Sequence, residues 1–394
     1  MDIKDSNIAI IHDWFLNNSL GGAEKVTFLL DKFLCDKYSK PDIFSLTSNL
    51  KFLEDHILKG RTINNSFIQS LPFGKSNVQN YLPLLPFAIE QIDLRKYNFI
   101  FSSSHAFAKG VITCPDQLHV SYVHTPMRYA WDQMQTYLEQ ITHAKSTLKI
   151  PIRYILYKLR EWDYLSAQRV DYLISNSNFT AKRIKKYWGL DSKVIHPPVE
   201  IERFDYKKNR GEFYLSVNRL VPNKRIDLLV KSFNKLGLPL IIIGDGPERF
   251  KLEKLAKSNI KFLGKKSNFI VSDYMNRCRA FVYAGLEDFG IAPIEAMAAG
   301  APVIAYGRGG ILDTVNCISN KNNKIPNGIL FKKQTVEDIF DSVLWFEDKK
   351  IWKKFNAQTL NDYAQKFNSN NFISKIESFL QKVWDDFHQN NIVY

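Results

Sequence analysis

The sequence predicts an α/β protein made of two doubly wound, parallel-sheet domains, and three observations support this fold class. The chain has 394 residues with 45% hydrophobic content, which is too long for one ordinary core and supplies enough apolar material for two. Short apolar runs alternate with helical stretches, as is typical of parallel sheets. A charged break at 194–212 divides these runs into two series.

The first series of apolar runs predicts the strands of an N-terminal domain. These runs are NIAIIHDW at 7–14, NFIFSSS at 98–104, HVSYVH at 119–124 and DYLISNS at 171–177. In the break that follows, the Pro197-Pro198 pair can continue neither a helix nor a central strand. We therefore expect an N-terminal Rossmann-like domain at 1–200.

The second series predicts another sheet and then a terminal helix. Its runs are EFYLSVN at 212–218, LPLIIIG at 238–244, IKFLG at 260–264, RAFVYAG at 279–285 and APVIAYG at 301–307. Beyond residue 366, apolar side chains recur at helical spacing, at Phe372, Ile376, Phe379, Leu380 and Val383. We expect a second Rossmann-like domain at 201–365 and a C-terminal helix at 366–394 that packs back on the first domain.

Composition and charge narrow the class of protein. No apolar run approaches the 18 residues or so of a spanning helix, and the opening MDIKDSNIAI carries charges where a signal peptide is apolar, so a cytoplasmic protein is expected. Four cysteines lie far apart, which indicates neither a zinc site nor a disulfide framework. A formal charge of +14 suits nucleic acid, an anionic membrane or a phosphate-bearing substrate, and charge alone does not choose among them.

Ligands of open α/β sheets bind beyond the carboxyl ends of the strands, so the residues after each apolar run are the site candidates. Gly21 and Gly22 lie after the first run and start a helical pattern, where backbone N–H groups and the helix dipole favour phosphate. An ordinary tight turn is the alternative, and two adjacent glycines alone favour it over a phosphate site. His124 ends the run HVSYVH, and a packed, hydrogen-bonded histidine is the alternative to a catalytic one.

In the second domain, Arg219 and Lys224 follow the first strand, in SVNRLVPNKRID at 216–227. Two cations in such a loop can flank a diphosphate, whose charge grows as its bond to a sugar breaks, although solvated surface cations are the alternative.

The segment EDFGIAPIEAMAAGAPVIAYGRGG at 287–310 is the most informative motif. A loop followed by a helix directs the backbone N–H groups of Gly290 and Ile291 at an anion. Glu295, one turn into the helix, can accept hydrogen bonds from ribose hydroxyls, and Glu287 would reach the sugar. Because Glu295 lies among apolar and small residues, its carboxylate needs partners.

These residues together resemble the family 4 retaining glycosyltransferases, which have the GT-B fold of two Rossmann-like domains facing a cleft. The resemblance is carried by Gly21-Gly22, by Ser216 to Leu220 with Lys224 and Asp227, by Gly244 to Glu248, and by Glu287 and Glu295. Asn218 stands where the family usually has glycine.

The resemblance implies a role for each site residue. Arg219 and Lys224 would hold the donor diphosphate, Glu295 the ribose, and Glu287 with the Gly290 and Ile291 amides the sugar and distal phosphate. Gly21 and Gly22 would meet the phosphate from the other domain, and His124 would lie against the transferred sugar. Asp13 and Arg128 are expected on the acceptor side. Transfer would retain configuration, without a protein nucleophile, a metal or a cofactor.

The stretch HTPMRYAWD at 124–132 further resembles O-antigen mannosyltransferases that use GDP-mannose. The expected acceptor is a lipid-linked oligosaccharide in O-antigen or capsule synthesis. A nucleotide-sugar 2-epimerase of similar fold is the alternative. A nucleic-acid-binding protein ranks lower, because the chain lacks a helix-turn-helix, zinc or aromatic-platform signature.

The segment 144–190 holds ten lysines and arginines against three acidic residues, with tyrosines and Trp162 between them in its first part. This composition favours contact with an anionic inner-membrane surface, with a solvated helical face as the alternative.

Overall fold

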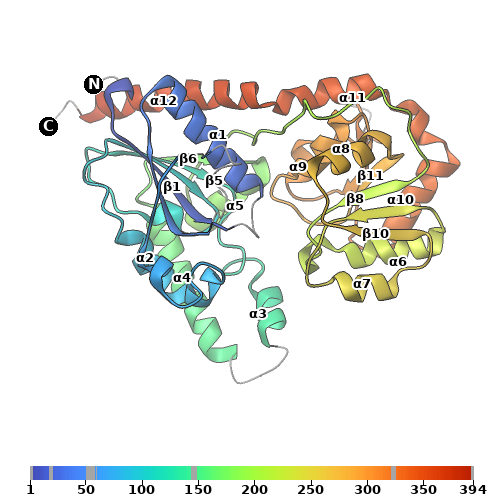
Figure 1. Cartoon of the computed structure of the whole chain (residues 1–394), viewed down its shortest axis with the longest axis horizontal. Helices are drawn as coiled ribbons and strands as arrows, with labels where there is room; N and C mark the ends of the chain where they lie inside the picture. The colour runs from blue at the N-terminus through green and yellow to red at the C-terminus, as the bar shows by residue number, and fades with distance from the viewer. Residues whose placement is uncertain are drawn as a thin grey trace. The chain divides into compact units, whose positions relative to one another are not determined.

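The computed structural model describes residues 3–16, 21–49, 58, 60–142, 149–320 and 325–391. The chain forms two compact units, each an α/β structure (Figure 1). The first unit comprises Met1–Pro197 and Phe372–Tyr394, and the second comprises Pro198–Asn371.

The first unit is built on a seven-stranded sheet of order β3-β2-β1-β4-β5-β6-β7, with neighbouring strands parallel. The strands are β1 (Ile8–Phe15), β2 (Asp42–Ser48), β3 (Ile63–Asn65), β4 (Phe99–Ser104), β5 (Leu118–Val123), β6 (Tyr172–Ser175) and β7 (Lys193–Val194). The helices between them are α1 (Gly22–Lys37), η3 (Phe67–Ser70), η4 (Val78–Leu84), α2 (Leu85–Glu90), η5 (Ala108–Gly110), α3 (Met134–Thr142), α4 (Lys149–Ala167) and α5 (Asn178–Trp188).

Helices cover both faces of this sheet. Successive strand residues point to opposite faces, and in β1 the apolar side chains on both faces are buried against helices. In β1, Ile8 and Ile10 belong to a core shared with α1 and the C-terminal helix. Ala9 and Ile11 belong to the core shared with α2 and α4. The continuous apolar run at 7–14 therefore fits a strand that is buried on both faces.

The second unit has a six-stranded sheet of order β10-β9-β8-β11-β12-β13, also parallel. Its strands are β8 (Tyr214–Val217), β9 (Leu240–Ile243), β10 (Ile260–Gly264), β11 (Ala280–Tyr283), β12 (Val303–Tyr306) and β13 (Gly328–Phe331). Its helices are η7 (Pro222–Lys224), α6 (Ile226–Leu236), α7 (Arg249–Leu255), α8 (Asn268–Arg277), α9 (Ile291–Ala298), η8 (Gly310–Asp313), α10 (Val336–Asp348), η9 (Ile351–Lys354), α11 (Ala357–Ala364) and η10 (Gln365–Phe367).

The C-terminal helix α12 (Ser369–Asn391) returns to the first unit. Its apolar stripe, including Phe372, Ile376 and Leu380, is buried in the core formed with α1 and the central strands. An ion pair between Lys37 of α1 and Glu377 adds a surface contact. The two doubly wound sheets and the returning helix confirm the predicted fold class. No helix in the described part of the chain has the length and apolar character needed to cross a membrane.

Candidate functional site

In the second unit, β8 and β11 are neighbours in the sheet, so the loops that follow them meet at one edge. These loops carry Lys224 and Glu287, respectively. They approach closely, because a Cβ atom added at Gly285 would lie 3.2 Å from the Cα atom of Lys224. Sheet topology thus brings together two residues that are 63 positions apart.

Lys224, Tyr283 and Glu287 form a hydrogen-bonded cluster that is partly open to solvent. The Lys224 Nζ atom donates to Oε1 of Glu287 and lies 3.3 Å from the Tyr283 hydroxyl oxygen. The Tyr283 hydroxyl donates to the same carboxylate oxygen. Sequence reasoning singled out Lys224 and Glu287 but missed Tyr283, because its residue type fits the buried strand in which it lies.

Arg219 lies exposed in the same loop as Lys224. The neighbouring Asn218 is buried, and its side-chain amide donates to Ser216 Oγ at 2.9 Å. Its carbonyl oxygen packs so closely on Gly244 that an added Cβ there would lie 1.8 Å away. Asn218 therefore packs inside the unit, where its backbone lies against that of Gly244, while the Arg219 side chain is exposed.

The start of α9 has the geometry of an anion site. Gly290 caps the helix with φ of 94°, a left-handed conformation that glycine adopts without steric cost, and Ile291 is the first helical residue. The N–H groups of a first helical turn have no partner within the helix, and the helix dipole adds partial positive charge. No acidic residue occupies the first turn of α9.

Glu295, farther along α9, is buried and paired with Arg203. The Arg203 Nη2 atom donates to Glu295 Oε1 at 2.5 Å, and Nη1 donates to the Asn268 carbonyl oxygen at 3.4 Å. The expected partner of this carboxylate is thus a cation from the segment before β8. Nothing in the sequence around Arg203 marks it for this contact.

Asp13 does not occupy the acceptor-facing position expected from the sequence. Its carboxylate is buried and accepts hydrogen bonds from four consecutive backbone N–H groups, those of residues 105–108. Burial opposes ionisation, but nearby His105 and His12 and these N–H groups hold the pKa of Asp13 below its ordinary value. We correct its role from acceptor contact to anchor of the loop after β4.

His124 has the packed, hydrogen-bonded arrangement that was the alternative to a catalytic role. Its Nε2 atom lies 2.8 Å from Ser103 Oγ, and its ring lies against Tyr122. Burial, with repulsion from His12 and His105, lowers the pKa of His124 to about 3. Burial also lowers the pKa of His119, on β5, to about 3. Both rings are therefore neutral near pH 7.

These two histidines predict that the protein loses stability in mild acid. The unfolded chain binds the proton at a pKa of about 6.5, above the folded value, so stability is present above that pH and is lost as pH falls. From about pH 7.5 to about pH 5.5, each histidine should remove about 1.4 kcal/mol from the free energy of unfolding. Urea titrations at both pH values should show this loss reduced by about that amount in His119→Gln. An unchanged pH dependence in the variant would contradict the buried neutral state.

Gly21 and Gly22 begin α1, as the sequence indicated, but a carboxylate already occupies part of this helix end. The Gly21 N–H group donates to Glu24 Oε2 at 2.7 Å. Glu24 Oε1 lies 4.0 Å from Nε2 of the buried His12. Burial opposes ionisation of Glu24, yet the proximity of His12 and His105 lowers its pKa below the ordinary value. The Gly22 amide is left as the better candidate for a phosphate.

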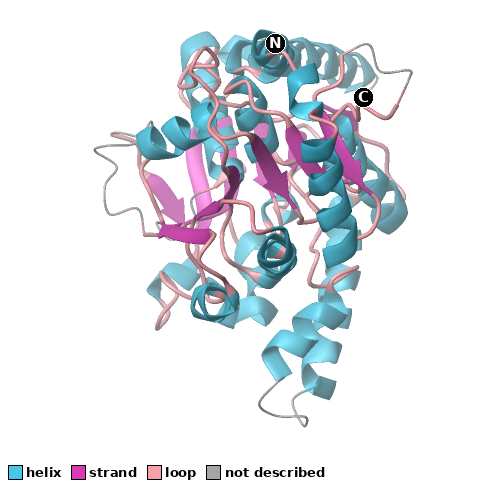
Figure 2. Ribbon diagram, turned by 90° about the vertical axis from the view of Figure 1, so that its right-hand side faces the viewer, coloured by secondary structure: helices cyan, strands magenta, loops and turns pink. Residues whose placement is uncertain are grey.

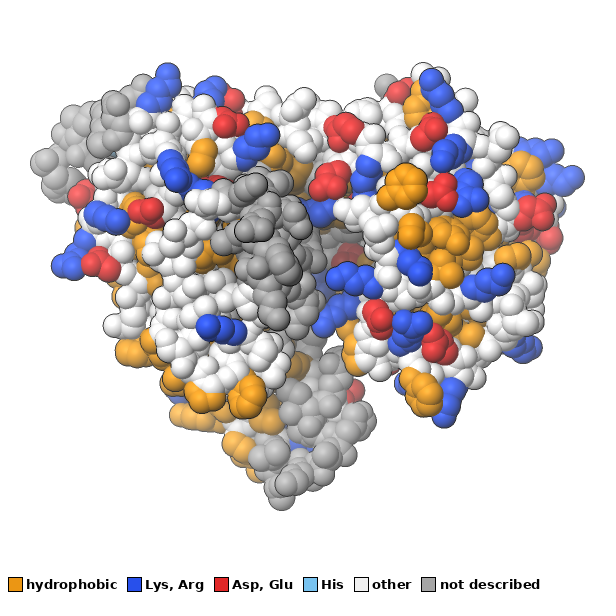
Figure 3. Space-filling model, viewed as in Figure 1, with side chains coloured by type: hydrophobic (Ala, Val, Ile, Leu, Met, Phe, Trp, Pro, Cys, Tyr) orange, Lys and Arg blue, Asp and Glu red, His pale blue; other side chains and the backbone are white. Residues whose placement is uncertain are grey.

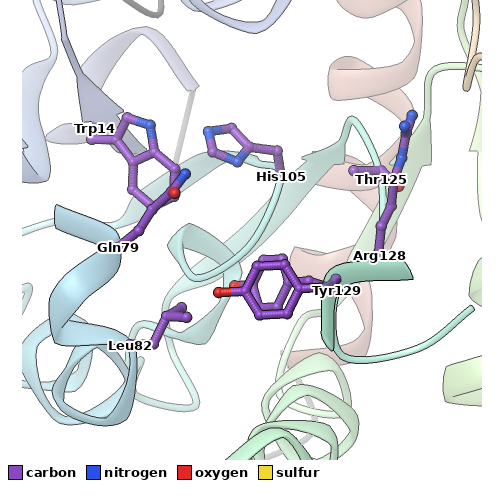
Figure 4. A pocket seen from close by; sticks show the side chains of 8 residues that line it. Trp14, Gln79, Leu82, His105, Thr125, Arg128 and Tyr129 are labelled. Carbon is purple, nitrogen blue, oxygen red and sulfur yellow. The ribbon is translucent and has the colours of Figure 1, made fainter. Parts of the chain in front are cut away.

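A cavity of about 220 Å³ opens in the first unit beyond the ends of β1, β4 and β5 (Figure 4). It is lined by Trp14, Gln79, Leu82, His105, Thr125, Arg128, Tyr129 and Tyr137. The Tyr129 hydroxyl is buried and has no hydrogen-bond partner among the described residues. Arg128, expected on the acceptor side, lies in the wall of this cavity. His105 was missed, although it follows the run NFIFSSS just as His124 ends HVSYVH.

Comparison with known families covers most of the chain. Residues 20–203 match the sequence model described as Glycosyltransferase Family 4, and residues 199–367 match the model described as Glycosyl transferases group 1. An uncharacterized glycosyltransferase of Methanocaldococcus jannaschii is 26% identical over 215 residues, which is 53% of this chain and 56% of that protein.

Two mannosyltransferases are similar to a comparable extent. An alpha-1,3/1,6-mannosyltransferase of Saccharomyces cerevisiae is 27% identical over 275 residues, covering 55% of this chain and 53% of that protein. The O-antigen chain mannosyltransferase of Salmonella typhimurium is 25% identical over 231 residues, covering 54% and 58%. The chain thus spans about half the length of the curated relatives it matches.

Solved structures show the same fold over nearly the whole chain. The HepE protein of Anabaena, solved with UDP and glucose, has a TM-score of 0.66 at 16% identity, covering 94% of this chain and 99% of that one. Sucrose-phosphate synthase from Thermosynechococcus elongatus has a TM-score of 0.70 at 14% identity, covering 96% and 100%. The two family models together account for residues 20–367, and the structural neighbours are GT-B glycosyltransferases. The chain therefore belongs to the family 4 glycosyltransferases and has the GT-B fold.

Proposed function

We propose that the protein transfers a sugar from a nucleotide diphosphate sugar to a glycan acceptor. The observation that carries this proposal is the cluster formed by Tyr283 at the end of β11 with Lys224 and Glu287 from the segments before α6 and α9. A cation, a hydroxyl and a carboxylate side by side can contact both the phosphate and the hydroxyls of a sugar donor.

Each part of the donor has a candidate partner in the second unit. Arg219, Lys224 and the amides of Gly290 and Ile291 would hold the diphosphate, since cations and a helix start both favour anions. Glu287 would contact the sugar. Glu295 would bind the ribose hydroxyls, with Arg203 fixing the direction of its carboxylate.

The chemistry we infer is front-face transfer with retention. The bond between the anomeric carbon and the donor phosphate breaks, and the acceptor oxygen bonds to the same face of that carbon. Because the acceptor itself attacks the face from which the phosphate leaves, no protein nucleophile is needed. The departing phosphate oxygen takes the acceptor proton, so no protein base is needed either. Lys224 stabilises the negative charge that accumulates on the diphosphate.

For the acceptor, we propose the cavity around Arg128, His105 and Tyr129. Its aromatic walls can stack on sugar rings, while the Tyr129 hydroxyl, which has no partner among the described residues, and the Arg128 guanidinium supply polar contacts. The names of the yeast and Salmonella relatives support mannose as the sugar, and hence GDP-mannose as the donor. An O-antigen or capsule precursor linked to a lipid is the acceptor we propose, met at the cytoplasmic face of the inner membrane.

Thermal-shift screening against nucleotides and nucleotide sugars tests this proposal first. A ligand at 100 times its dissociation constant should add about 2.7 kcal/mol to the free energy of unfolding. Incubation of the stabilising donor alone then separates two enzyme classes. A 2-epimerase would convert it to an isomeric sugar without an acceptor, whereas a transferase requires the acceptor to consume it. Isomerised product formed from donor alone would refute the transferase assignment.

We further predict that transfer needs no divalent metal, because we assign the balancing of the diphosphate charge to Arg219, Lys224 and the helix amides. Full turnover should persist in EDTA, measured against the same enzyme with added magnesium or manganese. Loss of turnover in EDTA that either metal restores would show that Arg219 and Lys224 do not suffice.

A further inference from the structure

Helix α4 exposes a stripe of large apolar and aromatic side chains at helical spacing. The stripe, called the α4 stripe below, consists of Ile150, Tyr154, Tyr157, Tyr164 and Leu165. Ile150 is 80% exposed, Tyr154 61% and Leu165 59%. The opposite face of α4 packs into the first unit through Leu156 and Leu159. The helix thus has two apolar faces, and only one of them is covered within the described residues.

Cations flank the α4 stripe. Lys149, Arg153 and Lys158 are exposed on the same helix. The Lys158 Nζ atom lies 5.2 Å from the Tyr157 ring centroid and 2.8 Å from Glu161 Oε2. Aromatic rings with lysine and arginine beside them are typical of surfaces that lie at the headgroup level of a bilayer.

A second exposed apolar set lies on elements next to α4. It consists of Phe67, Phe73, Leu84 and Phe87, on η3, α2 and the segment between them. Glu90 of α2 joins these elements to α4, because it accepts from Trp162 Nε1 at 2.9 Å and pairs with Arg169 at 2.7 Å. Hydrophobic side chains gather over this region in the lower left of Figure 3. The apolar surface therefore extends beyond one helix.

The structure shows which part of the basic segment 144–190 combines exposed cations with exposed apolar side chains. Lys145 lies outside the described residues. Arg160 donates to the Ala130 carbonyl oxygen at 2.8 Å, and Arg183 is paired with Asp132. Helix α5 exposes lysines but no large apolar side chain among its described residues. The coincidence of cations and exposed apolar groups is thus found on α4.

We propose that the α4 stripe and its flanking cations dock the protein on an anionic lipid bilayer. Helices α3 and α4 extend away from the sheet of the first unit (Figures 1 and 2), and the side chains of the stripe are exposed on α4. The inner face of the same helix contacts the segment that carries the cavity residues Arg128 and Tyr129, since Arg160 donates to the carbonyl oxygen of the neighbouring Ala130. A docked α4 would therefore hold the cavity close to the lipid surface.

Vesicle co-sedimentation without donor or acceptor tests the docking surface independently of the proposed enzyme activity. The probes are vesicles of phosphatidylethanolamine with or without phosphatidylglycerol. Wild-type protein should bind the anionic vesicles and be released by high salt. The variant Lys149→Gln/Arg153→Gln should lose roughly fivefold in affinity for each charge removed. Ile150→Ser/Tyr154→Ser/Leu165→Ser should lose about tenfold or more.

The matched control is Phe250→Ser/Phe269→Ser in the second unit, where the two rings are 70% and 83% exposed. It should bind vesicles as the wild type does, and thermal unfolding should show all variants folded. The proposal is overturned if the wild type does not bind anionic vesicles, or if the triple variant binds them with the affinity of the wild type. Equal loss in the control overturns it too. The proposal is also overturned if light scattering shows that the wild type is a dimer and the triple variant a monomer. A second copy of the chain would then cover the stripe.

Discussion

Replacing Lys109 by alanine is expected to lower the free energy of unfolding of the first unit by about 3 to 5 kcal/mol, because it leaves the buried Asp163 carboxylate without its counter-charge. The Lys109 Nζ atom lies 2.6 Å from Asp163 Oδ1, and both side chains are buried. The ammonium also donates to the Ala106 carbonyl oxygen at 3.2 Å. It lies about 5 Å from the ring centroids of Trp162 and Trp188.

The other carboxylate oxygen of Asp163, Oδ2, is also hydrogen-bonded. It accepts hydrogen bonds from Trp131 Nε1 at 2.7 Å and Trp188 Nε1 at 2.8 Å. The pair therefore joins η5, the segment after β5, α4 and α5. Two of these, η5 and the segment after β5, adjoin His105 and Arg128 in the cavity wall. We expect loss of Lys109 to loosen that wall as well as to destabilise the unit.

Hydrogen exchange in urea, followed on peptides of the first unit, measures this effect without assuming that the two units unfold together. The control is Arg95→Ala, which breaks the exposed pair with Asp93 and should change nothing measurable. Adding Asp163→Asn to Lys109→Ala should recover part of the loss, because the buried charge disappears while an acceptor for the indole N–H groups remains. Exchange rates in Lys109→Ala equal to wild type would contradict the expectation.

The fold was predictable because buried parallel strands leave a local signal. The runs at 238–244 and 279–285 are apolar on both faces and are bounded by polar or turn residues, so they mark β9 and β11 without tertiary information. In contrast, β2 was missed, because the longest apolar run in DIFSLTS is the pair Ile43-Phe44. The two-residue β7 is too short to leave a pattern.

The candidate site was predictable in part, for a physical reason. Loops after strands carry ligand contacts, so Lys224, Glu287 and Gly290 could be found from position alone. Whether a polar residue at a strand end faces a ligand or the protein interior depends on partners far away in sequence. Asp13 is held by the backbone of residues 105–108, and Glu295 by Arg203, and no local pattern encodes either contact.

For the donor site itself, we expect Lys224→Ala to lower kcat by about a hundredfold with little change in donor affinity. As the bond between sugar and phosphate breaks, negative charge accumulates on the diphosphate, so an ammonium beside it interacts more strongly in the transition state than before. Removing one such partner typically costs about 3 kcal/mol in the barrier. Tyr283 still donates to Glu287 in this variant, so the cluster keeps one of its contacts.

Glu295→Ala should have the opposite kinetic effect: the KM for the donor should rise, and kcat should be largely retained. The ribose does not change charge during transfer, so its contact with Glu295 is nearly equal in the ground and transition states. Lys235→Ala on α6, an exposed lysine near Glu337, is the matched control and should alter neither constant. Steady-state kinetics on the three variants, after circular dichroism confirms that each is folded, separates the two roles. If Lys224→Ala keeps the wild-type kcat at saturating donor, then Lys224 only orders its own loop through Glu287, and the diphosphate must be stabilised by other groups.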